Sequence, residues 1–302
     1  MMVGMVPVVL DTDRSREGFV LVAALWLLAA LTVLVTAASL YLAQSYKTLG
    51  AFDAALEVDM LKTAGVELAA YQLSIPATVR RPTRGHFGFR LAKSTVTVEY
   101  LSEAARINLN MAPRVMIAGL FAALGADPDA AAEFADRVAA WRTDPKPDAQ
   151  DEEAGLYRAA GLAYLPRRAP FSCAEELWLV LGLPPTLVER SLPFLTVYSG
   201  IAEINVLDAA PQVIAALPDM TDARLDAFLS SREQLPPDPD LVLGALGGKQ
   251  LGATVRGSDA YRLRIHMVLS SGRQKTSEGV IMMLGAGENE AFRILAWQDG
   301  IE

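Results

Sequence analysis

The longest pattern in the chain is an uninterrupted apolar run near its beginning. This run extends from Phe19 to Ala43 and contains no charged residue, and about 20 apolar residues suffice for a helix to cross a bilayer. Residues 44–73 contain no proline, and apolar side chains recur there at helical spacing between charged ones. The pattern predicts one long helix that crosses a membrane over 19–43 and then continues into water.

Alternating apolar and polar positions predict β-structure at two places that lie far apart in the sequence. Residues 87–101 predict one hairpin, which follows a basic, proline-containing connector. Three segments near the end, 261–270, 277–284 and 292–298, predict an antiparallel meander. We expect the hairpin and the meander to share one core with the long helix, in an α+β fold.

Between these β-segments the chain is rich in alanine and leucine and predicts short helices. A weak repeat relates residues 106–115 to residues 204–213. Each copy runs from an Ile-Asn pair to an Asn or Asp, followed by proline, which predicts an N-capped helix. Further on, Ser172 and Glu175 stand at capping-box spacing and predict a helix over 175–181.

Composition and charge exclude several classes of function. With a net charge of -8, the chain would be repelled by a phosphate backbone, so we expect no nucleic-acid partner. The single cysteine, Cys173, cannot form an intramolecular disulfide, and two histidines, His86 and His266, cannot supply an ordinary zinc cluster. The glycine-rich run 244–252 lacks the strand and helix order of a nucleotide site. We find no catalytic constellation and predict that the protein is not an enzyme.

The junction before the apolar run carries a more specific motif. Arg16-Glu17-Gly18-Phe19, followed directly by the long apolar helix, resembles the class III leader of type IV pilins and pseudopilins. By that resemblance, a prepilin peptidase cuts after Gly18, and Phe19 becomes the N-methylated start of the mature chain. A secretory signal would instead be cut after the apolar stretch. A plain signal anchor, in which Gly18 has no role, is the alternative.

The fifth residue after this junction is Ala23. Most pilin-like subunits carry a glutamate there, which is thought to meet the terminal amine of a neighbouring subunit. A carboxylate in hydrocarbon is retained only where it has a partner. A subunit without a neighbour above it would not need that glutamate.

Over nearly its whole length the chain resembles the K-type minor pseudopilin (GspK) family of type II secretion systems. The most specific parts are 106–110 (RINLN), 141–157, 164–177 and 204–217, together with Ala23. The resemblance implies a pilin-like fold, in which a long N-terminal transmembrane helix packs on an antiparallel sheet. It also implies a large helical insertion that is similar to SAM-like or helix-hairpin-helix domains.

The same resemblance implies a place in the cell and a set of partners. We expect a single-pass inner-membrane protein with the bulk of its chain in the periplasm, processed by prepilin peptidase. It would cap the pseudopilus as a tip and initiation subunit and pack against the I-type and J-type minor pseudopilins. The expected segments are a leader at 1–18, a transmembrane helix at 19–43, a helix extension with the first hairpin at 44–103, an inserted helical domain at 104–246 and C-terminal β-segments at 247–302.

Related proteins can hold calcium within the insertion, which makes the acidic loop at 141–157 a candidate site. Calcium takes six to eight oxygen ligands from carboxylates and carbonyls. The candidate ligands are Asp144, Asp148, Asp151, Glu152 and Glu153. Their spacing is not that of an EF-hand, and Pro145 and Lys146 interrupt the acidic pattern. A solvated acidic loop that holds no cofactor is the alternative to a calcium site.

Two other functions fit parts of the pattern. Residues 175–200 resemble a helix-hairpin-helix unit of DNA-binding proteins, so a membrane-anchored DNA-binding or uptake receptor is the alternative function. Around this hairpin, however, Arg190 is outnumbered by Glu175, Glu176 and Glu189, which makes a poor surface for phosphates. A periplasmic receptor with an uncleaved anchor would differ from the pseudopilin only in processing and partners.

Overall fold

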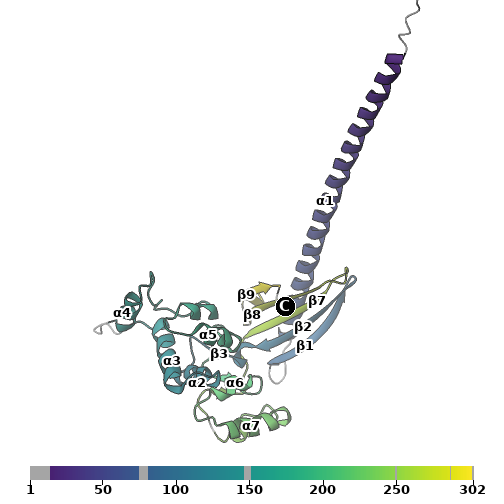
Figure 1. Cartoon of the computed structure of the whole chain (residues 1–302). Helices are drawn as coiled ribbons and strands as arrows, with labels where there is room; N and C mark the ends of the chain where they lie inside the picture. Colours follow the sequence, from purple (N-terminus) through teal and green to yellow (C-terminus); the bar gives the residue numbers. More distant parts are fainter. Residues whose placement is uncertain (1–13, 75–80, 146–150, 249, 286, 301–302) are drawn as a thin grey trace, which may run out of the picture. The chain divides into compact units, whose positions relative to one another are not determined.

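The computed structural model describes residues 14–74, 81–145, 151–248, 250–285 and 287–300. The chain divides into two compact units, 1–59 and 60–302, and each is considered by itself. Helices and an antiparallel sheet both contribute to the second unit, so the predicted α+β fold class is confirmed (Figure 1).

A single helix, α1 (Arg14–Ser74), contains both the apolar run and the charged segment that follows it. Within the run, the hydroxyl groups of Thr32 and Thr36 donate to the carbonyls four residues earlier at 2.7 Å, so these polar groups are satisfied inside the helix. Residues 19–42 have a mean hydropathy of 2.6 and are 0% buried. By length and composition this part of α1 can cross a membrane, as the sequence predicts.

The second unit is built on a five-stranded antiparallel sheet. Its order is β1-β2-β7-β8-β9, so the early hairpin joins the late meander along the β2–β7 pair, where Val98 lies opposite Ile265. Non-local pairing of this kind follows from the shared apolar face of both segments. The strands are β1 (Arg84–Leu91), β2 (Ser94–Ser102), β7 (Ala260–Val268), β8 (Gln274–Met283) and β9 (Phe292–Asp299).

The last turns of α1 pack on one face of this sheet. A glycine in α1, Gly65, permits the close approach, because a Cβ there would lie 3.1 Å from the Cδ1 of Ile265 and 3.3 Å from the Cγ2 of Val98. Leu61, Val66, Ala69, Ala70 and Leu73 of α1 are buried in the same unit. Residues of β2 alternate between buried and exposed positions, so its other face is free to carry charged side chains.

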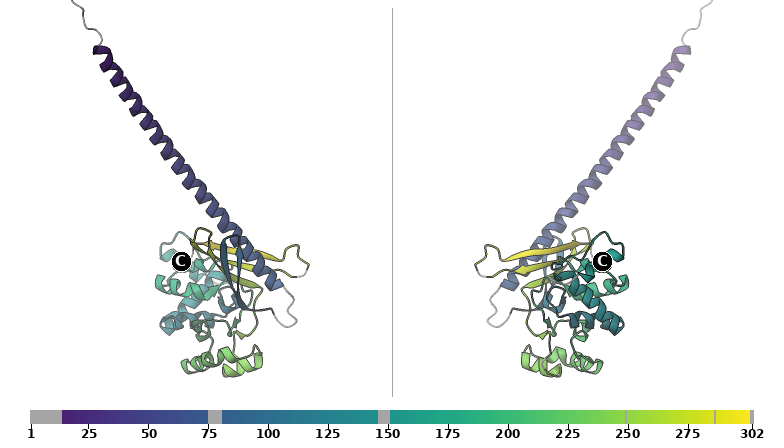
Figure 2. Two further views of the ribbon diagram at one scale, coloured as in Figure 1. Left: turned by 90° about the vertical axis from the view of Figure 1, so that its right-hand side faces the viewer. Right: turned by 90° about the vertical axis from the view of Figure 1, so that its left-hand side faces the viewer.

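Between β2 and β7 the chain forms a group of short helices, which we call the helical lobe (residues 103–259); Figure 2 shows it beside the sheet. One continuous hydrophobic core fills it, with Phe121, Tyr157 and Phe228 fully buried. The α-helices are α2 (Arg114–Ala123), α3 (Pro128–Arg142), α4 (Glu152–Ala159), α5 (Pro185–Ser191), α6 (Pro211–Ala215), α7 (Asp222–Ser231) and α8 (Pro239–Ala245). The 3-10 helices are η1 (Glu103–Ala105), η2 (Ala174–Leu179), η3 (Leu192–Phe194) and η4 (Arg232–Gln234).

Both copies of the sequence repeat fold in the same way. Each Ile-Asn pair is a two-residue strand in a parallel pair: β3 (Ile107–Asn108) with β4 (Leu195–Thr196), and β5 (Ile204–Asn205) with β6 (Ala253–Thr254). The side-chain oxygens of Asn108 and Asn205 then accept hydrogen bonds from the backbone N–H two residues later, at 2.8 and 3.1 Å. The repeat therefore has a structural cause, which is a strand followed by an Asx-turn.

The predicted side-chain caps in this repeat are wrong. The helices that follow, α2 and α6, have Pro113 and Ala210 as N-cap residues, and neither makes a side-chain cap bond. Asn110 instead bonds to the backbone of Phe171 in both directions, at 3.0 and 2.7 Å. Asp208 accepts from Asn205 at 2.7 Å. Asn110 and Asp208, which the sequence predicts as helix caps, therefore form hydrogen bonds with other partners.

The predicted capping-box helix is also wrong in kind. Residues Ala174–Leu179 form the 3-10 helix η2, whose N-cap residue Cys173 makes no side-chain cap bond. The carboxylate that reaches back belongs to Glu176, which accepts from the backbone N–H of Ser172 at 3.1 Å. The same carboxylate also accepts from the Trp141 indole at 3.3 Å, so contacts outside this turn decide its position.

Candidate functional site

The two connections between the sheet and the helical lobe meet at a pair of buried serines. Ser102 ends β2, and its Oγ accepts from the backbone N–H of Ala104 at 3.3 Å and of Ser258 at 2.9 Å. The Oγ atoms of Ser102 and Ser258 lie 3.1 Å apart. Because one serine leads into the lobe and the other leads out of it, these bonds tie both crossings together.

Next to this pair lies a carboxylate, Glu103, that is only 1% exposed. It accepts from the guanidinium of Arg262 on β7 at 2.8 and 3.3 Å and from the hydroxyl of Thr196 on β4. The Nε of Arg106 lies 4.0 Å from it. Glu103 thus links the sheet to the lobe, and its charge balances two partly buried arginine side chains.

The neighbouring charges on the outer face of the sheet reinforce this link. Arg262 also donates to Glu278 at 2.7 Å, and Arg264 donates to the same carboxylate at 2.9 Å. Although burial alone would raise the pKa of Glu278, these hydrogen bonds lower it below 4.5. The stabilisation from Glu278 is therefore complete above about pH 4.5 and is lost as the pH falls through its lowered pKa.

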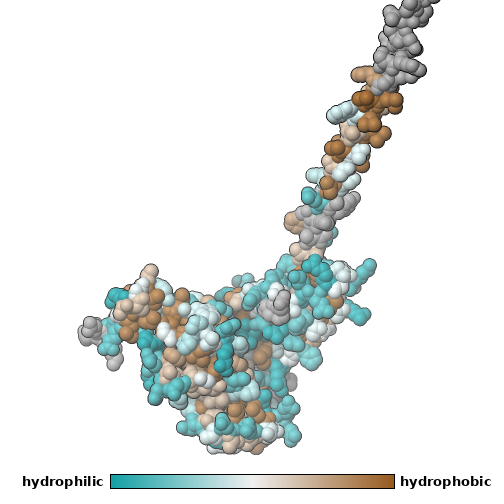
Figure 3. All heavy atoms as spheres, viewed as in Figure 1, coloured by the Kyte–Doolittle hydropathy of each residue, from teal (hydrophilic) through white to brown (hydrophobic). Residues whose placement is uncertain are grey.

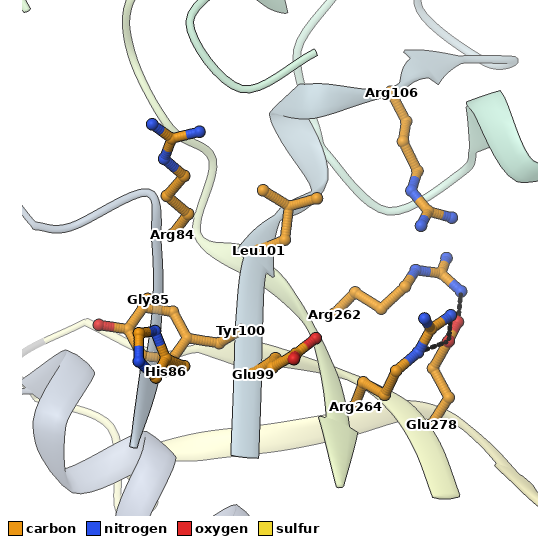
Figure 4. Close-up of a pocket in the computed structure, with 10 residues that line it drawn as sticks. All are labelled: Arg84, Gly85, His86, Glu99, Tyr100, Leu101, Arg106, Arg262, Arg264 and Glu278. Carbon is orange, nitrogen blue, oxygen red and sulfur yellow. Dashed lines mark hydrogen bonds and ion pairs between the residues drawn. The ribbon is translucent and has the colours of Figure 1, made fainter. Parts of the chain in front are cut away.

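A cavity of about 520 Å³ opens over the same strands (Figure 4). Four arginines and two glutamates contribute to its wall, and the guanidinium groups of Arg106 and Arg262 face the same space. Arg84, which belongs to the wall, forms an ion pair at 3.4 Å with Asp208, which does not. The lining residues are Arg84, Gly85, His86, Glu99, Tyr100, Leu101, Arg106, Arg262, Arg264 and Glu278. Each of these arginines already has a carboxylate partner, in Asp208, Glu103 or Glu278, so the cavity differs from the free basic surface that phosphate backbones require.

Two histidines and one cysteine are the side chains to consider as catalysts in the described part of the chain. His86 borders the cavity, and His266 pairs with the hydroxyl of Thr276 at 3.0 Å. Burial, followed by a hydrogen bond with Glu175, raises the pKa of the Cys173 thiol, so this cysteine is protonated at neutral pH. The Thr276 hydroxyl is therefore within hydrogen-bond reach of a histidine, but this pair is exposed on the sheet surface and does not border the cavity.

The acidic loop that the sequence assigns to calcium is only partly described. Asp148 lies outside the described residues, while Asp144 and Glu152 are exposed. Asp151 is the N-cap of α4, where its Oδ1 accepts from the backbone N–H of Ala154 at 2.9 Å. Within the residues that the structure describes, no group of three or more Asp, Glu, His or Cys side chains is arranged to hold a metal. The calcium site stays a prediction.

The predicted processing site lies at the start of the apolar run. Helix α1 begins at Arg14, so Gly18 and Phe19 belong to the same helix as the membrane-spanning part. Phe19 is 74% exposed. The cut after Gly18 and the methylation of Phe19 stay predictions.

Exposed apolar side chains also follow α1 beyond the apolar run. Phe52 and Leu56, which are 69% and 61% exposed, lie four residues apart and therefore share one face of the helix. In the second unit, Leu68 and Tyr71 of α1 are exposed as well. Figure 3 shows apolar residues along α1, and a mainly polar surface with apolar areas on the second unit. Apolar positions on a water-exposed helix are typical of a surface that packs against another protein.

Sequence reasoning missed the two arginines that organise the charged contacts of the second unit. Arg262 could have been noticed, because Arg262 and Arg264 alternate with apolar residues along a predicted strand and so must share its polar face. Arg168, which contacts the acidic loop, gave no periodic signal. Neither did Glu103, which is a single glutamate between a strand and a helix.

Comparison with known proteins gives two findings. Residues 98–200 match the family model described as type II secretion system (T2SS), protein K, and no curated protein matches the chain. The chain is also similar to one in the crystal structure of the GspK-GspI-GspJ complex from the enterotoxigenic Escherichia coli type 2 secretion system. The TM-score is 0.60 at 16% identity, and the match covers 86% of this chain and 100% of the other. At this identity the second finding concerns the fold.

Proposed function

We propose that the chain belongs to the type II secretion system protein K family, whose model matches residues 98–200. Within that family, we propose that it is a minor pseudopilin at the tip of a pseudopilus. One observation carries the proposal. Helix α1 (Arg14–Ser74) has an exposed apolar part and a terminal part that packs on the sheet. Such a helix can anchor the folded unit to a membrane and still present a long side to neighbouring helices.

We further propose that the chain is a single-pass inner-membrane protein whose sheet and helical lobe lie in the periplasm. Support comes from the one helix in the described residues that is long and apolar enough to cross a bilayer. After this helix, the surface of the second unit is mainly polar, as an aqueous compartment requires (Figure 3).

The proposed partners are the I-type and J-type minor pseudopilins. The related GspK is described in a complex with GspI and GspJ, and this chain covers the whole length of the matching chain from that complex. We propose that Phe52 and Leu56 contribute to the contact, because each leaves more than half of its side-chain surface in contact with solvent. Burial of apolar area at about 25 cal/mol per Å² would stabilise such an assembly.

The first test is processing and co-assembly in cells that express the chain with its prepilin peptidase and its I-type and J-type partners. We expect the purified protein to begin at a methylated Phe19 and to retain both partners through purification. Mass spectrometry of the N-terminus, with and without the peptidase, measures the first result. In the same cells, Leu56→Lys should reduce recovery of the partners, whereas Leu91→Lys, at an exposed strand end, should not. An intact leader in peptidase-containing cells, with no partners recovered, would contradict the proposal.

The tip position has a test of its own at Ala23. If no subunit lies above this chain, an added carboxylate at this depth has no partner, and burying it costs roughly 2–3 kcal/mol. Ala23→Glu should then leave pseudopilus assembly unchanged or impair it, with Ala23→Gln as the uncharged control. The length and number of pseudopili per cell are the readout. A clear increase in assembly with Ala23→Glu alone would mean that the chain has an upper neighbour.

A further inference from the structure

One arginine, Arg168, contacts both the end of α3 and the start of α4. Its guanidinium Nη1 donates to the backbone carbonyls of Ala140 and Thr143, at 2.5 and 3.1 Å. Its Nη2 donates to Asp151, and its backbone N–H donates to the carbonyl of Trp141 at 2.8 Å. Three oxygens from two segments of chain therefore surround a single cationic side chain.

This set of oxygens is of the kind that binds a hard cation. Ala140, Trp141 and Thr143 lie at the C-terminal end of α3, where the last carbonyls have no partner within the helix and where the helix dipole is negative. Asp151 begins α4. Carbonyls and carboxylates from neighbouring loops are also calcium ligands. In this protein, the oxygens of Ala140, Thr143 and Asp151 accept hydrogen bonds from the guanidinium of Arg168 instead.

A second arginine contacts Glu153, a partly buried carboxylate in the first turn of α4. The Nη1 of Arg137, from α3, lies 3.6 Å from the Oε1 of Glu153, and these two side chains are 16% and 15% exposed. Burial raises the pKa of Glu153, and Arg137 and then Arg168 oppose that rise. Asp151 and Glu153 thus each have an arginine partner, and a calcium ion that bound the Oδ1 of Asp151 would have to displace the guanidinium of Arg168.

The described residues do not fit the calcium site that the family resemblance predicts. We propose instead that Arg168 is the internal cation of the helical lobe. Its guanidinium joins the end of α3 to the start of α4 and supplies the positive charge that calcium would supply. The side chain is 17% exposed and its partner Asp151 is 32% exposed, so the contact is largely shielded from water. Folding of this lobe then requires no metal.

Thermal unfolding of the full-length chain in detergent tests this inference. We expect the same midpoint temperature in excess chelator and in excess calcium, because a ligand shifts the midpoint only where it binds the folded state. Calorimetric titration with calcium chloride should show no saturable binding. A midpoint that falls in chelator and returns with calcium would overturn the proposal.

Variants of the contact test the role of the arginine itself. Arg168→Gln should lower the midpoint by roughly 4–8 °C, because Asp151 and two carbonyls lose their partner. Arg158→Gln is the matched control: this arginine is exposed in the last turn of α4 and should leave the midpoint within about 1 °C. An Arg168→Gln protein that melts like the wild type would also overturn the proposal.

Asp151→Asn is a milder variant of the same contact, and it keeps the test usable if Arg168→Gln does not fold. Asparagine retains the side-chain oxygen that caps α4 and removes only the charge. It should lower the midpoint less than Arg168→Gln, and the double variant should lose less than the sum of both, because the two side chains act on each other. Additive losses in this cycle would contradict a direct contact.

Discussion

Glu103→Gln is expected to lower the free energy of unfolding by about 3–5 kcal/mol, which is the usual effect of removing one partner from a buried charge pair. Glutamine has nearly the same shape, so little packing is lost. The change removes the negative charge that faces Arg262 and Arg106, whose side chains are 22% and 19% exposed. Arg262 would retain Glu278, and Arg106 would keep no ion pair that we observe in the described residues. Denaturant unfolding at neutral pH measures the effect.

Glu99→Gln is the matched control for this prediction. Glu99 lies on β2, faces the same cavity and is exposed, and the chemical change is identical. Substitutions at such surface positions usually stay within about 0.5 kcal/mol. Equal losses in the two variants would show that burial of Glu103 does not matter. If Glu103→Gln proved harmless, the lobe would not depend on this carboxylate for its attachment to the sheet.

The parts of the fold that could be predicted from the sequence are those in which one side-chain period continues over many residues. Helix α1 is helical throughout because apolar residues recur at helical spacing and no proline interrupts them. The hairpin β1–β2 and the meander β7–β8–β9 are present because their alternation specifies which face is buried. In each case the signal is local, and a single sequence suffices to read it.

The contacts that define the candidate site have no such local signal. Glu103 and Arg262 are 159 positions apart, and Arg168 and Asp151 are 17 apart. Charged side chains of this kind look the same in sequence whether they are solvated or buried. The predicted calcium ligands illustrate the problem, because a carboxylate can meet a metal or an arginine with the same oxygens. Only the fold shows which arginine lies beside Asp151.

The predictions for short helices were wrong for a related reason. Capping patterns predict a helix from four residues, but Glu176 forms contacts with Ser172 and Trp141 that outweigh the local preference, and a 3-10 helix results. In the repeat, Asn110 bonds to Phe171, which is 61 positions away. Tertiary hydrogen bonds decide the ends of short helices in this lobe, and local propensity decides only where helices occur.

Gly119→Ala tests the packing of the helical lobe, and it should destabilise the protein by about 2 kcal/mol, which is the net of an overpacking cost of roughly 3 kcal/mol and the gain in helix preference. Gly119 lies in α2, and a Cβ there would be 2.5 Å from the carbonyl oxygen of Ala216 and 2.9 Å from its Cα. Both are backbone atoms, so no side chain can rotate away, and α2 must shift from the end of α6. Alanine favours a helix over glycine by about 1 kcal/mol, and this gain offsets only part of the loss. Denaturant unfolding of the full-length chain measures the balance.

Gly155→Ala provides a control with the opposite sign. Gly155 lies in α4, and a Cβ there meets no atom within 4 Å, so only the helix preference remains. This variant should stabilise the protein by roughly 0.5–1 kcal/mol. The same substitution in two helices of one lobe therefore separates the cost of close packing at Gly119 from the gain in helix preference, which alone acts at Gly155. If both variants were more stable than the wild type, Gly119 of α2 would not lie against the backbone of Ala216, and the close packing of α2 on the end of α6 would be contradicted.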